Sequence, residues 1–520
     1  MHPNDRSTGF SAKRIQITFN EFVQLKDVNT SFLSSPPFEN QPDILIKGKS
    51  LVISLNDTLK PNTTYRLFFG NAVQDLTENN PLSNLTYTFS TGKYLDSLRM
   101  KGLVVNAFTT KPKKEILVFL YKSSGDSVVY KEKPYYVAKT NENGSFEFEN
   151  IAAGLYNIVA LKDANNNFLC DGIAEDIGFA PQKITLDTSV MQTDTLTHDT
   201  LQKVKMLNIG TLQLFKQADS TQKILKASVT RHGQLTFCFS NPVKNLEILP
   251  LKEDSSFLTC IREINPGKDT IVFWLPKIIN DSARFCVADN GKILDTLNIS
   301  LKMQVRTRKG KSEAIEKPNA LTVELLLNNG TFYERRIPLS LVFSQPLLQY
   351  NWEKCKLVEE KDTLPIQIEF TDAVHRKAHV LHKWKENTQY QLIVPEDAVE
   401  DIFHQKNDSI LFPFKTRLLS EYGSLLMNIK LKPGTGNLIV QLLNEKDKVI
   451  EQHMINGDTP IKFEFLPPGK YQIKAVYDSN KNRKWDTGNY IKKIQPEKVV
   501  LYNKLLEIRA NWDIVENWDL

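Results

Sequence analysis

The chain has 520 residues and a net charge of +6, made up of 66 basic and 60 acidic side chains. This length exceeds what one hydrophobic core supports and predicts three to five domains of roughly 100–150 residues each. Hydrophobic residues at 41% and charged residues at 24% are ordinary for globular proteins and exclude a wholly disordered chain, while the near balance of charges predicts no nucleic-acid partner.

Segments with a two-residue period recur along the whole chain. Near the N-terminus Ile15, Ile17 and Phe19 alternate with polar residues, and the alternation returns at residues 146–148 and 471–475. Such a pattern places one face of a strand in a core and the other in water, as in antiparallel sheets. Turn sequences rich in Gly, Pro and Asn separate the runs, and convincing amphipathic helices are missing. We therefore predict an all-β chain of tandem β-sandwich modules, Ig-like and transthyretin-like.

Two internal repeats divide the chain. Residues 154–171 return as 469–486, with every matched position offset by 315, and motifs within 62–91 return within 387–416, offset by 325 or 326. Two module types thus follow one another twice, around one further sandwich. The predicted modules are module 1 (1–95), module 2 (96–215), module 3 (216–305), module 4 (306–418) and module 5 (419–520).

Four motifs in module 1 carry a resemblance to a known domain. They are ITFNEFV at 17–23, SPP at 35–37, LKPNTTY at 59–65 and FSTG at 89–92. With these motifs module 1 resembles the bacterial Ig-like domain of S-layer and related surface proteins. Module 4 is a divergent version, because its Pro-Pro element is not obvious.

Modules 2 and 5 share a different set of motifs. These are NGSF at 143–146 and AGLYNI at 153–158 in module 2, and PGKYQI at 468–473 in module 5. The glycine permits a tight turn, and the tyrosine enters the next strand as a core anchor. Both modules resemble the carboxypeptidase-regulatory or transthyretin-like sandwich. The chain as a whole is similar to the Ig-like domain lipoproteins of Bacteroidetes-type bacteria.

This resemblance implies export by a lipoprotein signal and attachment through a lipidated cysteine. The sequence departs from that pattern, because residues 2–7 lead into no apolar segment and no lipobox is present. The start codon is placed too late or the gene is truncated, and we favour a missing leader. The resemblance then implies the cell envelope, as a periplasmic or outer-membrane-associated lipoprotein. No run reaches the roughly 18 apolar residues that span a bilayer, so the membrane would be reached only through a lipid anchor absent from this chain.

Two loops offer the only converging ligand-type side chains. In the first, Asp163, Asn165, Asn167 and Asp171 take positions 1, 3, 5 and 9 of a calcium-loop-like spacing, which directs oxygens toward a hard cation. The second loop repeats the spacing 315 residues later. Its predicted metal residues are Asp478, Asn480, Asn482 and Asp486.

Other features of the two loops favour a structural turn without an ion. Position 6, a glycine in calcium loops, holds Phe168 in the first loop and Arg483 in the second. The glutamate of position 12 is absent, although Glu175 follows one residue late. Asp and Asn also build turns without any cation. Calcium is therefore the one candidate cofactor, more so in the first loop than in the lysine-rich second loop.

The sequence contains no catalytic signature. A GxSxG elbow, a P-loop and a CxxC pair are all missing, and the five cysteines lack zinc-site spacing. We interpret the cysteines as buried thiols, with a disulfide between the sheets of module 3 as the alternative. We predict no enzyme and no catalytic residues.

The leading functional hypothesis is a monomeric, rod-like envelope protein whose modules serve as a binding scaffold or spacer, with an envelope protein or glycan as partner. The alternatives are a carbohydrate- or peptide-capture lipoprotein for nutrient uptake, and an enzyme concealed in module 3.

Overall fold

The computed structural model describes the chain apart from residues 124, 126, 188–191, 195–203, 252–256, 258, 307–311, 316–319, 328–331 and 334. The all-β prediction is confirmed, since strands dominate and the α-helices among the described residues are two single turns. No helix in these ranges is long and apolar enough to cross a membrane. Each predicted module contains its own cluster of buried hydrophobic side chains. The module boundaries themselves stay predictions.

Module 1 is a sandwich with an aromatic core. The buried rings of Tyr65 and Phe89 stack with centroids 5.3 Å apart, and Ile15 and Ile17 join the same core, as their period of two requires. The strand orders are β1-β5-β4, β3-β6-β8 and β2-β7. Its elements are β1 (Arg14–Thr18), β2 (Val23–Leu25), α1 (Val28–Ser31), β3 (Leu33–Ser35), β4 (Asp43–Lys47), β5 (Ser50–Ser54), β6 (Thr64–Phe68), β7 (Val73–Asp75) and β8 (Thr86–Ser90).

In module 2 the first and last long strands, β9 and β17, pair in parallel within the path β11-β10-β13-β14-β17-β9-β12. This path leaves β11 and β12 as its two ends. Tyr156 is fully buried, and its hydroxyl donates to the carbonyl of Ala152 at 2.9 Å. The elements are β9 (Leu98–Asn106), β10 (Leu117–Tyr121), α2 (Val128–Lys131), β11 (Tyr136–Lys139), β12 (Ser145–Ile151), β13 (Gly154–Leu161), η1 (Gly172–Ala174), β14 (Asp176–Phe179), β15 (Ile184–Leu186), β16 (Gln192–Asp194) and β17 (Val204–Lys216).

Module 3 has two facing sheets, β18-β19-β22-β21 and β20-β23-β24, and a hairpin of β25 and β26 follows it. Cys238 and Cys286 lie on different sheets, and the structure holds all five cysteines of the chain as free thiols. The elements are β18 (Ile224–Arg231), β19 (Gln234–Phe239), β20 (Leu246–Pro250), β21 (Ile261–Ile264), β22 (Thr270–Trp274), β23 (Ser282–Asp289), β24 (Lys292–Ser300), β25 (Met303–Arg306) and β26 (Ser312–Ile315).

Module 4 repeats strand pairs of module 1, since β30 pairs with β36 as β2 does with β7, and β35 pairs with β37 as β6 does with β8. Tyr390 and Phe414 stack at 5.5 Å in its core, as Tyr65 and Phe89 do in module 1. The elements are β27 (Val323–Leu326), β28 (Phe332–Tyr333), β29 (Ser340–Phe343), β30 (Leu347–Tyr350), η3 (Trp352–Lys354), β31 (Lys356–Glu359), β32 (Asp362–Leu364), β33 (Gln367–Phe370), β34 (Lys377–Leu381), β35 (Gln389–Val394), β36 (Val399–Asp401) and β37 (Ile410–Thr416).

Module 5 repeats the closure of module 2, because its first strand β38 pairs in parallel with its last strand β45. The buried Tyr471 donates to the carbonyl of Pro467 at 2.8 Å, the same contact that Tyr156 makes. The elements are η4 (Leu419–Glu421), β38 (Gly423–Lys430), β39 (Leu438–Asn444), β40 (Val449–Ile455), β41 (Thr459–Leu466), β42 (Gly469–Tyr477), β43 (Val499–Leu501), β44 (Leu506–Ile508) and β45 (Asp513–Asp519).

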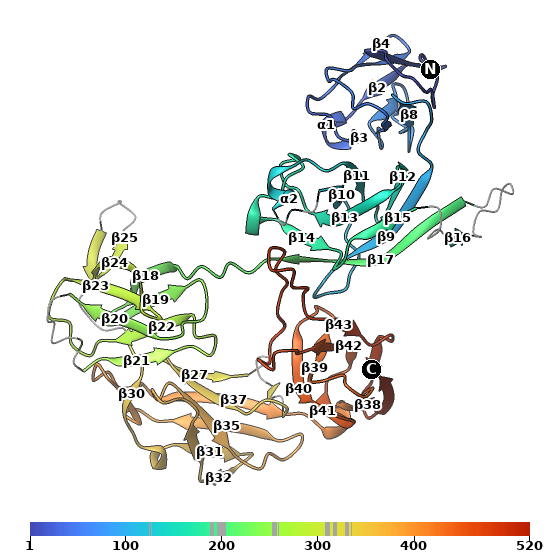
Figure 1. Cartoon of the computed structure of the whole chain (residues 1–520). Helices are drawn as coiled ribbons and strands as arrows, with labels where there is room; N and C mark the ends of the chain where they lie inside the picture. Colours follow the sequence, from blue (N-terminus) through green and yellow to red (C-terminus); the bar gives the residue numbers. More distant parts are fainter. Residues whose placement is uncertain are drawn as a thin grey trace.

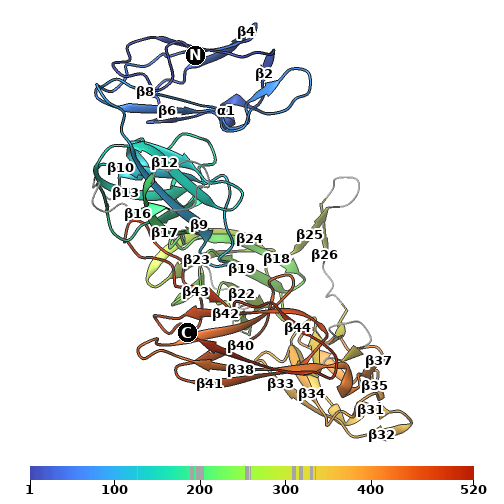
Figure 2. The same cartoon turned by 90° about the vertical axis from the view of Figure 1, so that its right-hand side faces the viewer.

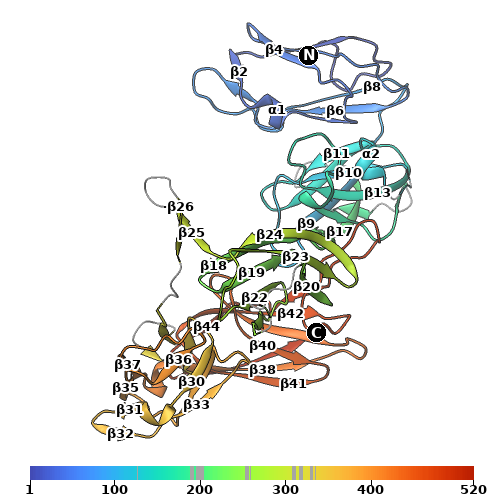
Figure 3. The same ribbon diagram turned by 90° about the vertical axis from the view of Figure 1, so that its left-hand side faces the viewer.

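The modules do not form a straight rod, so that part of the sequence-based hypothesis is wrong. Figure 1 shows the chain turning back, with module 5 (red) returning to module 2 (cyan), and the side views in Figures 2 and 3 place module 1 at one end of the molecule. The return is made by direct hydrogen bonds. Thr487 Oγ1 donates to the carbonyl of Lys216 at 2.6 Å, and Gln495 Nε2 donates to the carbonyl of Phe179 at 3.0 Å.

Modules 3 and 4 are joined through a half-buried ion pair. Arg376 Nη1 donates to both carboxylate oxygens of Glu263 at 2.9 Å, and its guanidinium lies 5.0 Å from the ring centre of Trp274. Trp274 is fully buried and donates from Nε1 to the same carboxylate at 2.8 Å. Ile402 and Phe403 of module 4 pack around this tryptophan. The junction is therefore both apolar and charge-matched.

Candidate functional site

The first Asp/Asn loop is a self-contained network of hydrogen bonds. Asp163 accepts the backbone amides of Asn165 at 3.3 Å and Phe168 at 2.8 Å. The side-chain amide of Asn165 donates to Asp171 at 2.7 Å, and that of Asn167 donates to the same carboxylate at 3.4 Å. The four predicted metal residues are thus brought together, with the two amide groups converging on Asp171.

The second Asp/Asn loop has the same geometry. Asp478 accepts the backbone amides of Asn482 at 3.0 Å and Arg483 at 2.9 Å. The side-chain amides of Asn480 and Asn482 both donate to Asp486. Position 6 has a left-handed backbone in both copies, with φ +62° at Phe168 and +66° at Arg483. The glycine conformation of a calcium loop is therefore kept, although a side chain is present there.

A buried glutamate closes each loop, and sequence reasoning found only one of the two. Glu175 accepts the backbone amides of Ala164 and Asp171, both at 2.9 Å. In the second copy Glu497 accepts those of Ser479 at 2.8 Å and Asp486 at 3.0 Å. These glutamates stand 322 positions apart, seven more than the repeat offset of 315. The second loop therefore contains seven additional residues, which hid Glu497 from a gapless alignment.

A cation in either loop would require the Asn side-chain amides to rotate by half a turn, so that carbonyl oxygens replace the NH₂ groups that face the aspartates. This rotation would break the hydrogen bonds in which Oδ1 of Asn165, Asn167, Asn480 and Asn482 accepts a backbone amide. Among the described residues no three Asp, Glu, His or Cys side chains gather as a metal-binding group, so an ion here would depend on those amide oxygens. Calcium binding stays a prediction for both loops.

We expect calcium to stabilise the full chain if it binds the folded loops. At a free concentration about 100 times the dissociation constant, one site adds about 2.7 kcal/mol, which raises the melting temperature. Asp171→Asn and Asp486→Asn each remove one carboxylate and therefore assign the effect to a loop. The check is differential scanning calorimetry with excess chelator and with added calcium. Equal melting temperatures in the two conditions would refute the calcium prediction.

The seven additional residues form most of a contact that we call the clasp, defined as residues 487–495 of module 5 against module 2 and the two residues that follow it, Lys216 and Gln217. Tyr490 is 2% exposed and meets the ring of Phe179 edge-on at 5.3 Å. Its backbone amide donates to Gln217 Oε1 at 2.9 Å. Gly488 lies so close to Phe215 that an added Cβ would stand 2.5 Å from a ring carbon. The clasp is thus a close-packed contact between the two repeats.

A second contact supports the clasp from the other side. Phe108 of module 2 packs on Trp485 at 5.0 Å and on the apolar residues of module 5 around Val476. The ammonium of Lys474 lies 3.6 Å from the centre of the Phe108 ring, and burial lowers the pKa of Lys474 to about 8. At the rim Lys111 pairs with Asp447 at 2.6 Å. Modules 2 and 5 are therefore joined by apolar, cation–π and ionic contacts.

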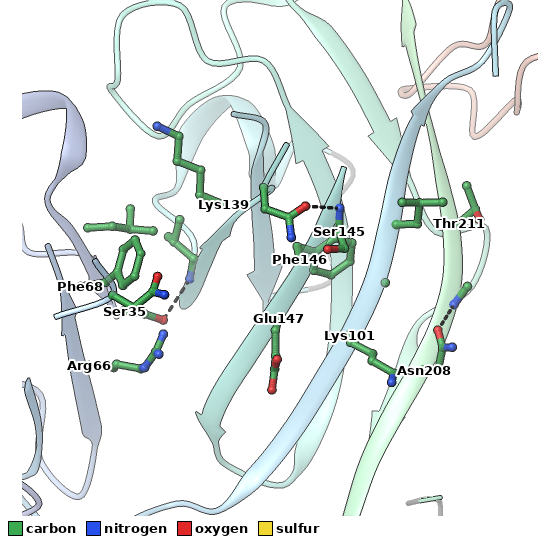
Figure 4. Close-up of a pocket in the computed structure, with 17 residues that line it drawn as sticks. Ser35, Arg66, Phe68, Lys101, Lys139, Ser145, Phe146, Glu147, Asn208 and Thr211 are labelled. Carbon is green, nitrogen blue, oxygen red and sulfur yellow. Dashed lines mark hydrogen bonds between the residues drawn. The ribbon is translucent and has the colours of Figure 1, made fainter. Parts of the chain in front are cut away.

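An open groove of about 610 Å³ lies between modules 1 and 2. Figure 4 shows Ser35, Arg66 and Phe68 on one side and Ser145 and Glu147 of β12 on the other. The remaining lining residues are Leu33, Asn84, Lys101, Gly102, Leu103, Val137, Lys139, Asn141, Phe146, Asn208, Gly210 and Thr211.

A ladder of alternating charges borders this groove and crosses the module junction. Arg66 of module 1 pairs with Glu149 of module 2 at 2.7 Å, Arg99 pairs with the same glutamate, and Arg99 lies 3.8 Å from Glu147. Partial burial raises the pKa of Glu147, and the neighbouring Glu149 adds to this rise while Arg99 opposes it. Ser35 Oγ also accepts the backbone amide of Val137 at 3.1 Å. The floor of the groove is therefore charged, and these ion pairs and this hydrogen bond hold the two modules together there.

Module 3 has a smaller hollow of about 460 Å³. Its polar lining consists of Lys244, Asn245, Arg262, Asn265 and Lys268, which supply cations and amides. The lining residues that the structure describes include no carboxylate, histidine or hydroxyl group that could act as a base or nucleophile. This hollow offers charge to a ligand but no acid–base pair for chemistry.

Comparisons with known proteins agree with the sandwich architecture. Residues 1–91 match the family model described as a bacterial Ig-like domain. This match confirms the Ig-like prediction for module 1, whereas the transthyretin-like and lipoprotein resemblances stay predictions. A search of curated proteins found no match.

Several solved structures are similar to the chain at low identity. BcpA, the major pilin subunit of Bacillus cereus, is 8% identical with a TM-score of 0.16 and covers 81% of this chain and 98% of its own. The surface-layer protein SbsC (domains 1–6) is 11% identical with a TM-score of 0.15, covering 96% and 66%. The major pilin SpaD of Corynebacterium diphtheriae is 10% identical with a TM-score of 0.16, covering 81% and 96%. Such scores are too low to transfer an arrangement or a function.

Proposed function

We propose that this chain is a non-enzymatic, monomeric binding scaffold of the bacterial cell envelope. The observation that supports it most is the clasp, which closes modules 2 to 5 into one body through contacts such as Thr487 with Lys216 and Tyr490 with Phe179. Module 1 then extends from this body with the open groove at its base. A rigid body that displays a groove at a module junction suits a binding role.

The envelope location rests on the Ig-like match of residues 1–91 and on the motif resemblance of the whole chain. The partner would be an envelope protein or a glycan, and attachment to the membrane would be through a lipid anchor. The groove also favours capture of a soluble ligand as a second candidate function, because its volume lies in the range of small-molecule sites.

Fractionation of the source bacterium tests the location. With an antibody against the chain we expect the protein in the envelope fraction, released by detergent and labelled by a radioactive fatty acid. Recovery in the cytoplasmic fraction, alongside a cytoplasmic marker enzyme, would contradict the proposal.

A further inference from the structure

The groove between modules 1 and 2 is bounded by two sheet faces. On the module 1 side, β3 and β6 are in register as the pairs Leu33–Phe68 and Ser35–Arg66. On the module 2 side, β12, β9 and β17 place Glu147, Lys101 and Asn208 in one cross-strand row. Ser145, Leu103 and Thr211 form the next row. A ligand here would meet an apolar pair, a guanidinium and two rows that are mainly polar.

The side-chain amides of this groove are held as hydrogen-bond donors. Asn141 Oδ1 accepts the backbone amides of Asn143 and Ser145, both at 3.0 Å. Asn208 Oδ1 accepts that of Gly210 at 2.9 Å, as drawn in Figure 4. Because the carbonyl ends are fixed by the backbone, the NH₂ ends of these two exposed side chains are oriented as donors.

The charged side chains add to this excess of donors. Arg66, Lys101 and Lys139 line the groove, against Glu147 in its lining and Glu149 at its border, which pairs with Arg66. Figure 4 shows Lys139 and Lys101 at opposite ends of the groove, with Glu147 between them. The groove therefore matches an extended ligand that is rich in acceptors and carries negative charge at more than one point.

The walls favour recognition through side chains over addition of a peptide strand. Strands β3 and β11 are edges of their sheets, but the outward amide of Val137 on β11 is already taken by Ser35 Oγ at 3.1 Å. The two edges are thus bridged to each other where a strand would have to enter. Amides, hydroxyls and one carboxylate suit a ligand with many hydroxyl groups, and the apolar Leu33–Phe68 pair suits the C–H face of a sugar ring.

We propose that this groove binds an anionic oligosaccharide, a hydroxylated chain that carries carboxylate or sulfate groups. The inference rests on the proposed scaffold function and names the ligand class of that scaffold. Lys101, Lys139 and the NH₂ groups of Asn141 and Asn208 bind the anionic groups, while Glu147 accepts from a sugar hydroxyl.

The test uses isothermal titration calorimetry on the full chain at physiological salt. The probes are oligogalacturonate, its methyl ester, a heparin-derived oligosaccharide and polyglutamate. The variant Asn141→Asp/Asn208→Asp keeps the acceptors for the backbone amides and replaces both donors with anions. Asn444→Asp is the matched control, because Asn444 Oδ1 accepts the amides of Lys446 and Lys448, both at 3.0 Å, but lies in module 5.

We expect the chain to bind oligogalacturonate, the heparin-derived oligosaccharide or both. If oligogalacturonate binds, its methyl ester should bind more weakly, because the ester has lost the carboxylate charge. The double variant should weaken binding at least about tenfold, because it replaces two charge-assisted hydrogen-bond donors with anions. Asn444→Asp should leave the affinity unchanged. The difference in affinity between oligogalacturonate and the heparin-derived oligosaccharide shows whether the groove prefers carboxylate or sulfate.

Three results would overturn the proposal: binding of neither saccharide, polyglutamate binding as tightly as the saccharides, or an equal loss of affinity in Asn444→Asp. Equal melting temperatures of the three proteins show that the substitutions spare the fold. A failure here leaves the envelope location untouched, because fractionation measures that location without a ligand.

Discussion

Gly488→Val is expected to open the clasp between modules 2 and 5 while each module stays folded. A side chain at residue 488 would place its Cβ 2.5 Å from a ring carbon of Phe215 and 2.8 Å from the carbonyl oxygen of Ile494. Such overpacking costs about 1–3 kcal/mol. Leaving module 2 relieves the contact with Phe215, and a shift within the loop relieves the contact with Ile494. Hydrogen exchange at residues 487–495 should then become about tenfold to a hundredfold faster, and the radius of gyration in solution scattering should rise.

Gly457→Val is the matched control for this substitution. Gly457 lies in a turn of the same module, and a Cβ there would meet no atom within 4 Å. Exchange at 487–495 and the radius of gyration should both stay at their wild-type values. An unchanged radius together with unchanged exchange in Gly488→Val would mean that the clasp does not hold the modules together.

Arg376→Ala should destabilise the junction of modules 3 and 4 by about 2 kcal/mol. Removing one partner of a fully buried ion pair lowers the free energy of unfolding by about 3–5 kcal/mol. We expect a smaller loss here because the side chains of Arg376 and Glu263 are each 20% exposed. The variant leaves Glu263 with only the Trp274 indole as a hydrogen-bond donor among the contacts described for it. Urea unfolding measures the free energy of unfolding of each variant. A double-mutant cycle with Glu263→Ala then gives the interaction energy between Arg376 and Glu263.

Arg509→Ala is the control for this second substitution. Its guanidinium also lies 5.0 Å from a tryptophan ring, that of Trp512, and pairs with a carboxylate, Glu507, at 3.3 Å. These groups are exposed, at 57% for Arg509 and 58% for Glu507, so the expected change is within about 0.5 kcal/mol. A similar loss in both variants would show that desolvation at the junction contributes nothing.

The sequence predicted the elements within modules better than the contacts between modules. A two-residue period and a sequence repeat depend on local backbone conformation and on burial. Ile15 and Ile17, which follow the period, and Tyr156 and Tyr471, which belong to the repeat, all lie in the cores where these patterns placed them. Contacts between distant segments, such as Gln495 with Phe179, leave no periodic signal.

The candidate sites were predictable to different degrees. The eight Asp and Asn residues of the two loops could be found because side-chain spacing alone brings them together. Glu497 was missed because seven additional residues shift it from the repeat register. The one usable signal for the clasp was that same insertion, since a long excursion that carries a large aromatic side chain, Tyr490, is costly unless the ring is covered. The groove could not be predicted, because Arg66 and Glu147 belong to different modules.

The closed arrangement of modules 2 to 5 is tested most directly by a zero-length cross-link. Lys111 Nζ lies 2.6 Å from Asp447 Oδ2 although 336 positions separate them in the sequence. Carbodiimide treatment of a dilute equal mixture of ¹⁴N- and ¹⁵N-labelled chains should yield a Lys111–Asp447 peptide of unmixed isotope composition in mass spectrometry. Absence of this peptide, or its appearance with mixed-isotope pairs in the proportion that random pairing between chains gives, would contradict a chain that folds back on itself.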